Sequence, residues 1–281
     1  MGIRIITDST SDIGIREAAG LGITVIPLKV IFDGKEYKDG IDITIDEFYE
    51  KLAAAECLPT TSQPSPDDFL EYFIEGKKAN DSIIVIVIAS KLSGTFQSAM
   101  IAREMAEYED IHIIDSNTTT CALRILVEQA VKLRDEGKGT EEIVETLIEL
   151  RDRIVLLAMV DTLEYLHKGG RLSKSSTILG TLLKFKPIIT VKEGAIGVLG
   201  KERGLNKAIG RVVDEIGVFG EIDTSYPIFL GYTARDEQSR LLRDKLNEKY
   251  GLMDLPMHPV GCVVGTHAGP GACMITYVKK Q

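Results

Sequence analysis

The segment from Asp81 to Met100 constrains the fold more than any other part of the chain. Its first half contains seven consecutive apolar residues, 83–89, and most of them are isoleucine or valine. This pattern predicts a strand that is buried on both faces of a parallel sheet. A short polar loop follows, and a helical pattern begins at Phe96. The order of strand, loop and helix is typical of an α/β fold.

The loop at residues 91–95 is a predicted binding site for an anion. In α/β proteins, ligands bind beyond the carboxyl ends of the strands. The backbone N–H groups of a helix's first turn lack partners, and together with the helix dipole they favour negative charge. Ser93 and Thr95 add two hydroxyl groups, and Gly94 allows a ligand to approach the backbone closely. We therefore expect a phosphate or a carboxylate beside Ser93.

The rest of the pattern predicts two units. Up to residue 160, strands alternate with helices, which predicts right-handed crossovers and a mainly parallel sheet. The expected strands are 3–7, 23–32 (turning back at Asp33-Gly34), 83–89, 111–115 and 154–160, and the expected helices are 45–55, 66–78, 119–136 and 140–153. Further on, we expect helices at 161–167, 173–185, 204–219 and 234–250, a hairpin of 187–191 with 195–199, and strands at 228–232, 259–264 and 273–278. The fold class is thus α/β, with an N-terminal α/β domain over 1–160 and a C-terminal α+β domain over 161–281.

Composition excludes several classes of protein. The formal net charge of -9 and the pI of about 5.1 argue against a nucleic-acid partner. Four cysteines without C-x-x-C spacing support neither a zinc site nor a disulfide framework, and they fit a reducing cytoplasm. No charge-free apolar window approaches 18 residues, so we expect neither a signal peptide nor a transmembrane helix.

Four loops are rich in small hydrogen-bonding residues, and they are 8–12, 60–65, 93–95 and 265–271. They offer many N–H and hydroxyl donors and few charged side chains, which suits one carboxylate or a small phosphate. Such residues also cap helices and form turns in any protein. The loops therefore indicate a ligand only if the fold brings them together.

Three individual side chains are candidates for function. His267, in GTHAGPG after the predicted strand 259–264, can donate to an anion or exchange a proton at neutral pH, or it lies in an ordinary surface loop. No second ligand at suitable spacing supports a metal. Arg171 follows two glycines and can reach an anion, a partner protein or an interdomain acid. Arg203 is in a similar Lys-Glu-Arg-Gly turn, where solvated surface charge is the default interpretation.

An enzymatic alternative remains open. Neither a G-x-G-x-x-G motif after a strand nor a G-x-x-x-x-G-K-[ST] motif occurs. Ser93 and His267, with an acid such as Asp115, would suit a hydrolase, and the same pair would suit a transferase that acts on a small acid or an acyl ester. Ser93 is not in a G-x-S-x-G elbow, which weakens this alternative.

Five motifs together resemble the DegV family, which includes the fatty-acid-binding subunits of bacterial fatty acid kinase. They appear in the family's order across nearly the whole chain, as DSTSD at 8–12, TSQPS at 61–65, SGTFQSA at 93–99, GGRLS at 169–173 and GTHAGPG at 265–271. The resemblance implies two α/β domains with a fatty acid between them. It makes the chain a non-enzymatic carrier in lipid metabolism, with no cofactor beyond the bound fatty acid and no metal.

The resemblance also implies roles for individual residues. Thr61, Ser62 and Ser93 would contact the carboxylate, His267 would assist directly or through water, and the acyl chain would lie in an apolar tunnel. Gly94 and Thr95 would shape the loop, Arg171 would lie near the entrance or a partner surface, and Arg203 would meet the catalytic subunit of a fatty acid kinase. That kinase would phosphorylate the bound carboxylate, and transient contact with a membrane surface is compatible with this role. A regulatory module that senses acyl groups would share the ligand but not the kinase.

Overall fold

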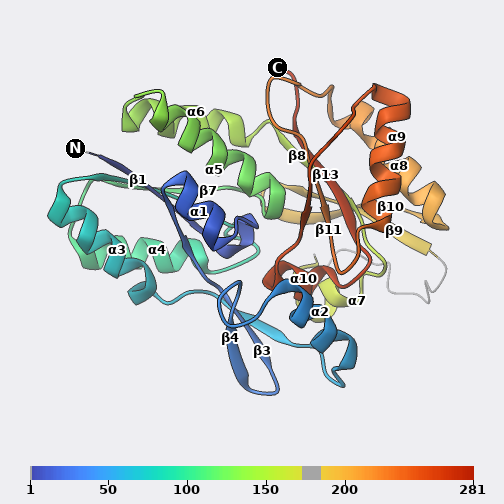
Figure 1. Ribbon diagram of the computed structural model, residues 1–281, viewed down its shortest axis with the longest axis horizontal. Helices are drawn as coiled ribbons and strands as arrows, with labels where there is room; N and C mark the ends of the chain where they lie inside the picture. Colours follow the sequence, from blue (N-terminus) through green and yellow to red (C-terminus); the bar gives the residue numbers. More distant parts are fainter. Residues whose placement is uncertain (1, 173–184) are drawn as a thin grey trace.

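The computed structural model of the chain describes residues 2–172 and 185–281. In this part of the chain the strands form three sheets (Figure 1). The first sheet is parallel, in the order β2 (Ile23–Ile26), β1 (Ile3–Asp8), β6 (Ser82–Val87) and β7 (Ile111–Asp115). The second is mixed, in the order β10 (Ala195–Arg203), β9 (Phe185–Lys192), β8 (Ile154–Met159), β13 (Cys273–Val278), β11 (Phe229–Tyr232) and β12 (Met257–Pro259). The third is a small antiparallel sheet of β4 (Lys35–Lys38), β3 (Lys29–Phe32) and β5 (Thr60–Ser62).

Strand β6 is one of the two inner strands of the parallel sheet, and both its faces are buried, as its apolar run predicted. Successive side chains of a strand point to opposite faces. Ile84 and Ile86 pack toward α1 (Ile15–Leu21), α5 (Thr120–Asp135) and α6 (Thr140–Arg151). Ile83 and Val85 pack on the other face, toward α3 (Pro66–Ala79) and α4 (Thr95–Ala106).

Strand β8 divides its side chains in the same way. Leu157 and Met159 join the apolar core beneath α8 (Leu205–Phe219) and α9 (Glu237–Tyr250), which cover the outer face of the mixed sheet (Figure 1). Leu156 and Ala158 point to the inner face, where they meet Leu92 of the β6–α4 loop. A separate apolar core therefore lies between the parallel sheet and the mixed sheet.

Helix α5 joins the two larger sheets. Its buried side chains pack against β1 and β6 of the parallel sheet and against β8, β11 and β13 of the mixed sheet. Strand β8 precedes the predicted domain boundary in the chain but pairs with β9 and β13, which follow it. The division into 1–160 and 161–281 stays a prediction.

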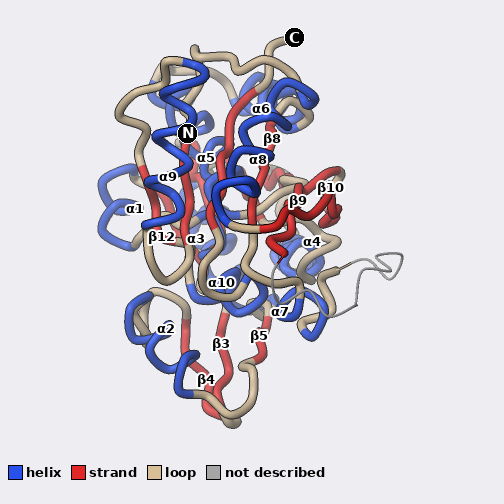
Figure 2. The backbone as a smooth tube through the Cα atoms, turned by 90° about the vertical axis from the view of Figure 1, so that its right-hand side faces the viewer, coloured by secondary structure: helices blue, strands red, loops and turns tan. Residues whose placement is uncertain are grey.

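The small sheet projects below the other two and packs on α2 (Ile45–Ala54) and α10 (Cys262–Ala268) (Figure 2). The single strand predicted over 23–32 is wrong, because the chain forms β2 and β3 in different sheets. Pro27 lies between them and has no N–H group to donate to a ladder, so it ends the pairing of β2. The turn at Asp33-Gly34 is confirmed, since β3 and β4 form an antiparallel hairpin around it.

The strand predicted over 259–264 is also wrong. β12 ends at Pro259, and α10 begins at Cys262. The hairpin of β9 and β10 is confirmed, and the short helix near 161–167 is α7 (Glu164–Lys168). The helix predicted over 173–185 falls almost entirely on residues outside the described ones, and Phe185 begins β9. None of the described helices is both long enough and apolar enough to pass through a membrane.

Candidate ligand-binding site

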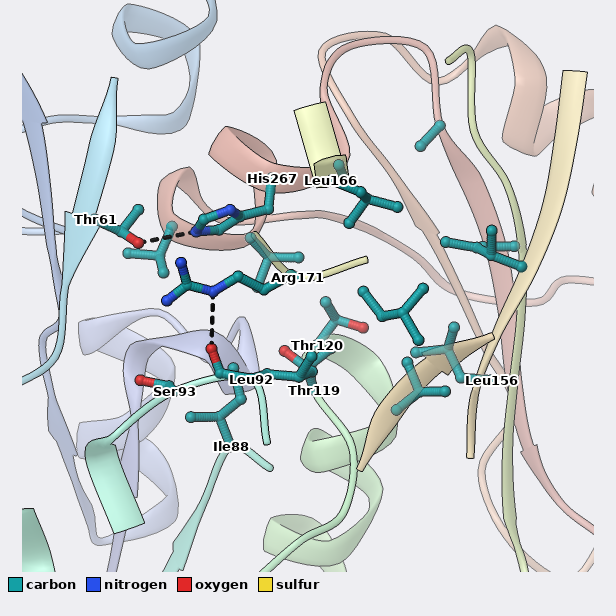
Figure 3. A pocket seen from close by; sticks show the side chains of 18 of the residues that line it. Thr61, Ile88, Leu92, Ser93, Thr119, Thr120, Leu156, Leu166, Arg171 and His267 are labelled. Atoms are coloured by element: carbon teal, nitrogen blue, oxygen red, sulfur yellow. Dashed lines mark hydrogen bonds between the residues drawn. The ribbon is translucent and has the colours of Figure 1, made fainter. Parts of the chain in front are cut away.

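A cavity of about 320 Å³ lies in the core between the parallel and mixed sheets (Figure 3). This volume is within the range of small-molecule pockets. Its apolar walls come from the β6–α4 loop, the inner faces of β8, β9, β10 and β13, and two helices, through Ile88, Leu92, Leu156, Ala158, Val160, Leu166, Ile189, Val191, Ile196, Val263, Val264 and Met274. Its polar lining gathers Thr61, Ser62, Gln63, Ser93, Thr119, Thr120, Arg171 and His267. The cavity can therefore hold a ligand with one polar group and a long apolar part.

Ser93 lies between the end of β6 and the start of α4, as the sequence pattern predicted. Its Oγ lies 2.8 Å from Oγ1 of Thr95, which is fully buried and does not line the cavity. Gly94 does not line the cavity either, but its missing side chain is required. A β-carbon at Gly94 would collide with the side chain of Gln63, which is hydrogen-bonded from Nε2 to Oγ of Ser98 over 3.0 Å. The absence of a side chain at Gly94 thus lets Gln63 lie against the loop, and Thr95 is hydrogen-bonded to Ser93.

Thr61 and His267 meet across the cavity wall, although they are far apart in the chain. Thr61 lies on β5 and His267 on α10, and Oγ1 of Thr61 is 2.9 Å from Nε2 of His267 (Figure 3). His267 was predicted in a loop, but it lies in the last turn of α10, two residues before Gly269. A β-carbon at Gly169 would collide with Nδ1 of His267, so the first glycine of the GGR motif leaves room for the ring.

His267 is electrically neutral at pH 7. Burial disfavours the charged imidazolium, and the nearby Arg171 cation repels it, so the pKa of His267 falls to about 4. Within the described residues, its buried Nδ1 has no hydrogen-bond partner. The histidine can thus serve as a neutral hydrogen-bonding group, and the proton exchange at neutral pH that its sequence context suggested does not fit this environment.

Arg171 is the positively charged side chain among the described residues that line the cavity. Its Nε donates to the carbonyl oxygen of Leu92 over 3.0 Å (Figure 3). Its Nη1 donates to the carbonyl oxygen of Gly169 over 2.7 Å. These bonds hold the guanidinium beside the β6–α4 loop. Burial lowers the pKa of Arg171, and within the described residues it forms no ion pair. A half-buried cation without a counter-ion favours an anionic ligand at this end.

The loop at 8–12 does not line the cavity, although it was grouped with the donor loops. Its first turn is the short 3₁₀ helix Ser9–Ser11. Asp8 is fully buried, and its Oδ2 accepts from the N–H of Ile88 over 2.7 Å. Burial raises the pKa of Asp8 to about 6. Asp12 accepts from the N–H of Gly261 over 2.9 Å, at the start of α10. The loop therefore fixes two segments that line the cavity.

The three residues of the hydrolase alternative are not linked to one another by hydrogen bonds. His267 is bonded through Nε2 to Thr61, and Ser93 to Thr95. Oδ1 of Asp115 accepts from the backbone N–H groups of Ser90 and Asn117 at 3.2 and 3.0 Å. Among the described residues, no base is thus hydrogen-bonded to Ser93.

Comparisons with known proteins match nearly the whole chain to one family. The family model described as "Uncharacterised protein, DegV family" matches residues 2–280. The chain belongs to the DegV family. A DegV domain-containing protein of Caldanaerobacter subterraneus is 39% identical over 278 residues, which is 99% of each chain. The resemblance seen in the sequence is thereby confirmed.

Solved structures of DegV proteins share this fold. A fatty-acid-binding DegV family protein of Thermus thermophilus matches with a TM-score of 0.90 and 32% identity, over 99% of this chain and 100% of the other. The Streptococcus pneumoniae fatty acid kinase (Fak) B3 protein, loaded with linoleic acid, matches with a TM-score of 0.85 and 26% identity over the full length of both. The mixed α/β fold expected from the sequence is confirmed.

Sequence reasoning missed several residues that line the cavity of this DegV protein. Gln63 stands within the TSQPS motif, but only its neighbours Thr61 and Ser62 were selected. Thr119 and Thr120, at the start of α5, follow strand β7 as Ser93 follows β6, and this shared position was a usable signal. Arg203 is an exposed residue at the end of β10 and does not line the cavity.

Proposed function

We propose that this chain binds one long-chain fatty acid in the cavity between its two larger sheets. The carboxylate lies among Thr61, Ser62, Ser93 and Arg171, with His267 as a neutral neighbour. The acyl chain lies against the inner faces of β8 and β9. One observation carries the proposal: the same cavity is lined by hydroxyl groups, by an arginine that has no counter-ion among the described residues, and by isoleucine, leucine and valine side chains.

The energetics of such a ligand suit this cavity. Each CH₂ group moved from water into an apolar environment contributes about 0.8 kcal/mol, so a long chain supplies most of the affinity. A buried carboxylate is tolerated only when it is hydrogen-bonded or paired. Arg171 and the hydroxyl groups of Thr61 and Ser93 provide that compensation at one end of the cavity.

We further propose that the chain is a cytoplasmic carrier that presents the carboxyl group to a fatty acid kinase. Its likeness to the pneumococcal Fak B3 protein supports this role. Arg203, exposed at the end of β10, is our proposed contact for the kinase. The phosphate would come from the kinase, so this chain itself would need only to hold and release the ligand.

Native mass spectrometry of the purified protein tests the binding proposal. We expect a mass increment that matches one fatty acid, its loss on delipidation, and its return when palmitate or oleate is added. Absence of both co-purified and added fatty acid would overturn the proposal. The same delipidated protein, incubated with acyl esters and with phosphate donors, tests the enzymatic alternative. Turnover that disappears in Ser93→Ala would replace the carrier with a hydrolase or a transferase.

A further inference from the structure

The interior of the cavity is not uniformly apolar. Two threonines at the start of α5, Thr119 and Thr120, line it and are only 6% and 1% exposed. In the view of Figure 3 they lie between Ser93, at the polar end, and Leu156, on the apolar wall of β8. A simple saturated acyl chain has no group that needs these two hydroxyls.

The hydroxyl group of Thr119 is buried without a partner. Thr119 is the residue that precedes the first turn of α5, a position whose side chain normally accepts a hydrogen bond from an N–H of that turn. Here the side chain makes no such bond, and among the described residues its Oγ1 has no hydrogen-bond partner. Buried hydroxyls in folded proteins are nearly always bonded, and one that is not requires an explanation.

Thr120 is held in a costly conformation beside it. Its φ of 54° is in the left-handed region, which a β-branched residue rarely adopts. Strain of this kind persists where the surrounding structure enforces it, and it gathers at ligand sites. The Oγ1 of Thr120 donates to Sδ of Met274 over 3.3 Å, and a thioether is a weak acceptor. Neither threonine hydroxyl thus has a strong partner within the described protein.

The helix behind these residues adds an attraction for an acceptor. α5 runs for 16 residues, from Thr120 to Asp135. The N–H groups of its first turn have no acceptors within the helix, and the helix dipole makes this end partly positive. A ligand oxygen placed here would accept from Thr119 and would be favoured by the helix end.

We propose that the cavity takes an acyl chain that carries an oxygen substituent, a hydroxyl or an oxo group, which accepts a hydrogen bond from Thr119. This inference rests on the proposed fatty-acid binding and narrows its ligand class. An unsubstituted acyl chain leaves the Thr119 hydroxyl without a hydrogen-bond partner, whereas the oxygen of the substituted chain accepts a hydrogen bond from it. The oxygen of the substituent, bonded to Thr119, is then itself a satisfied acceptor in the apolar interior.

A binding series with the delipidated full-length protein tests the proposal. The ligands are palmitic acid and hydroxypalmitic acids whose hydroxyl is near the carboxyl group, in the middle of the chain or at its far end, with an oxo analogue of the best isomer. The protein variants are Thr119→Val, which keeps the shape but removes the hydroxyl, and Thr119→Ser, which keeps the hydroxyl. Isothermal titration gives each affinity.

We expect one hydroxy isomer to bind at least as tightly as palmitic acid to the original protein. Its affinity relative to palmitic acid should fall about tenfold or more in Thr119→Val, the effect of one lost hydrogen bond, and should be kept in Thr119→Ser. If every isomer binds more weakly than palmitic acid by the same factor in all three proteins, the proposal is wrong. Equal weakening of palmitic and hydroxy acids by Thr119→Val would assign Thr119 to the carboxyl group and would also overturn it.

The test still decides the proposal if fatty-acid binding fails or if Thr119→Val does not fold. If no ligand binds at all, the proposed fatty-acid function fails, and this outcome is distinct from plain acids binding while hydroxy acids do not. If Thr119→Val does not fold, native mass spectrometry of the original protein with an equimolar mixture of palmitic acid and the hydroxy isomers gives the preference directly. Exclusive retention of palmitic acid in that mixture would contradict the proposal.

Discussion

Among the described residues, one side chain carries the charge at the polar end of the cavity. Arg171 carries it, while the pKa of His267 is lowered to about 4 by burial and by that same arginine. Thr61 and Ser93 contribute hydroxyl groups only. A carboxylate would thus be held by one cation that is already bonded to two carbonyl oxygens, together with neutral donors. Such an arrangement leaves the carboxyl group less tightly clamped than a bidentate ion pair would.

Replacing Ser93 by alanine should weaken fatty-acid binding with little effect on folding. Loss of a buried hydroxyl donor to a charged group costs about 1–3 kcal/mol. Titration of delipidated protein with palmitate measures this loss. Ser90→Ala is the matched control, because Ser90 is exposed in the same loop and does not line the cavity. A large loss of stability with unchanged binding would instead assign Ser93 to the support of the loop and of Thr95.

His267 should make the protein less stable at acidic pH. In the unfolded chain a histidine takes up its proton near pH 6.5, but in the folded protein His267 does so only near pH 4. The contribution of neutral His267 to the free energy of unfolding is therefore complete above pH 6.5 and is lost as the pH falls toward 4. Between pH 7 and pH 5 the loss should be about 2 kcal/mol, at 1.36 kcal/mol per pH unit.

Urea unfolding of the original protein and of His267→Gln at both pH values isolates this effect. The two proteins must be compared because Asp8 also titrates in this range. Burial raises the pKa of Asp8 to about 6, so acidification below pH 6 stabilises the folded state through Asp8, which opposes the effect of His267. The glutamine variant should lose less stability between pH 7 and pH 5. Identical losses in the two proteins would show that His267 is not the group responsible.

Residues within one loop could be predicted from the sequence, and pairings between loops could not. The hydroxyls of Ser93 and Thr95 follow from the strand, loop and helix pattern alone. The contact between Thr61 and His267 joins residues 206 positions apart, and nothing local encodes it. Likewise the alternation along β8 predicts two apolar faces but not that Leu156 and Ala158 face a cavity.

At the scale of elements, α10 depends on residues distant in the chain. Val263 and Val264 are β-branched and favour a strand, which is why the sequence predicted one. In the folded protein, Oδ1 of Asp39 accepts from the N–H of Cys262 over 3.1 Å, and Oδ1 of Asp12 accepts from the N–H of Gly261. These buried carboxylates bind N–H groups at the start of the helix and overcome its local preference.

Asp39→Ala should therefore destabilise the protein by about 1–2 kcal/mol, the usual cost of losing a helix cap. It should also weaken palmitate binding, because α10 carries His267 and the lining residues Val263 and Val264. Asp39→Asn retains a carbonyl acceptor and should keep more of both properties. Urea midpoints and palmitate titrations of the two variants check this. Equal damage in both would show that the charge of Asp39, and not its acceptor, supports α10.

For the whole molecule, the proposed ligand site lies at the junction of the two larger sheets, and α5 packs against both. A bound fatty acid should therefore stabilise the chain as one unit. At a free concentration one hundred times the Kd, binding adds about 2.7 kcal/mol to the free energy of unfolding, which should raise the Tm by roughly 5 °C or more. Calorimetry of delipidated protein with and without palmitate measures the shift, and Arg171→Met should reduce it at the same palmitate concentration. Two transitions, of which palmitate moves only one, would show that the site belongs to a single half of the molecule.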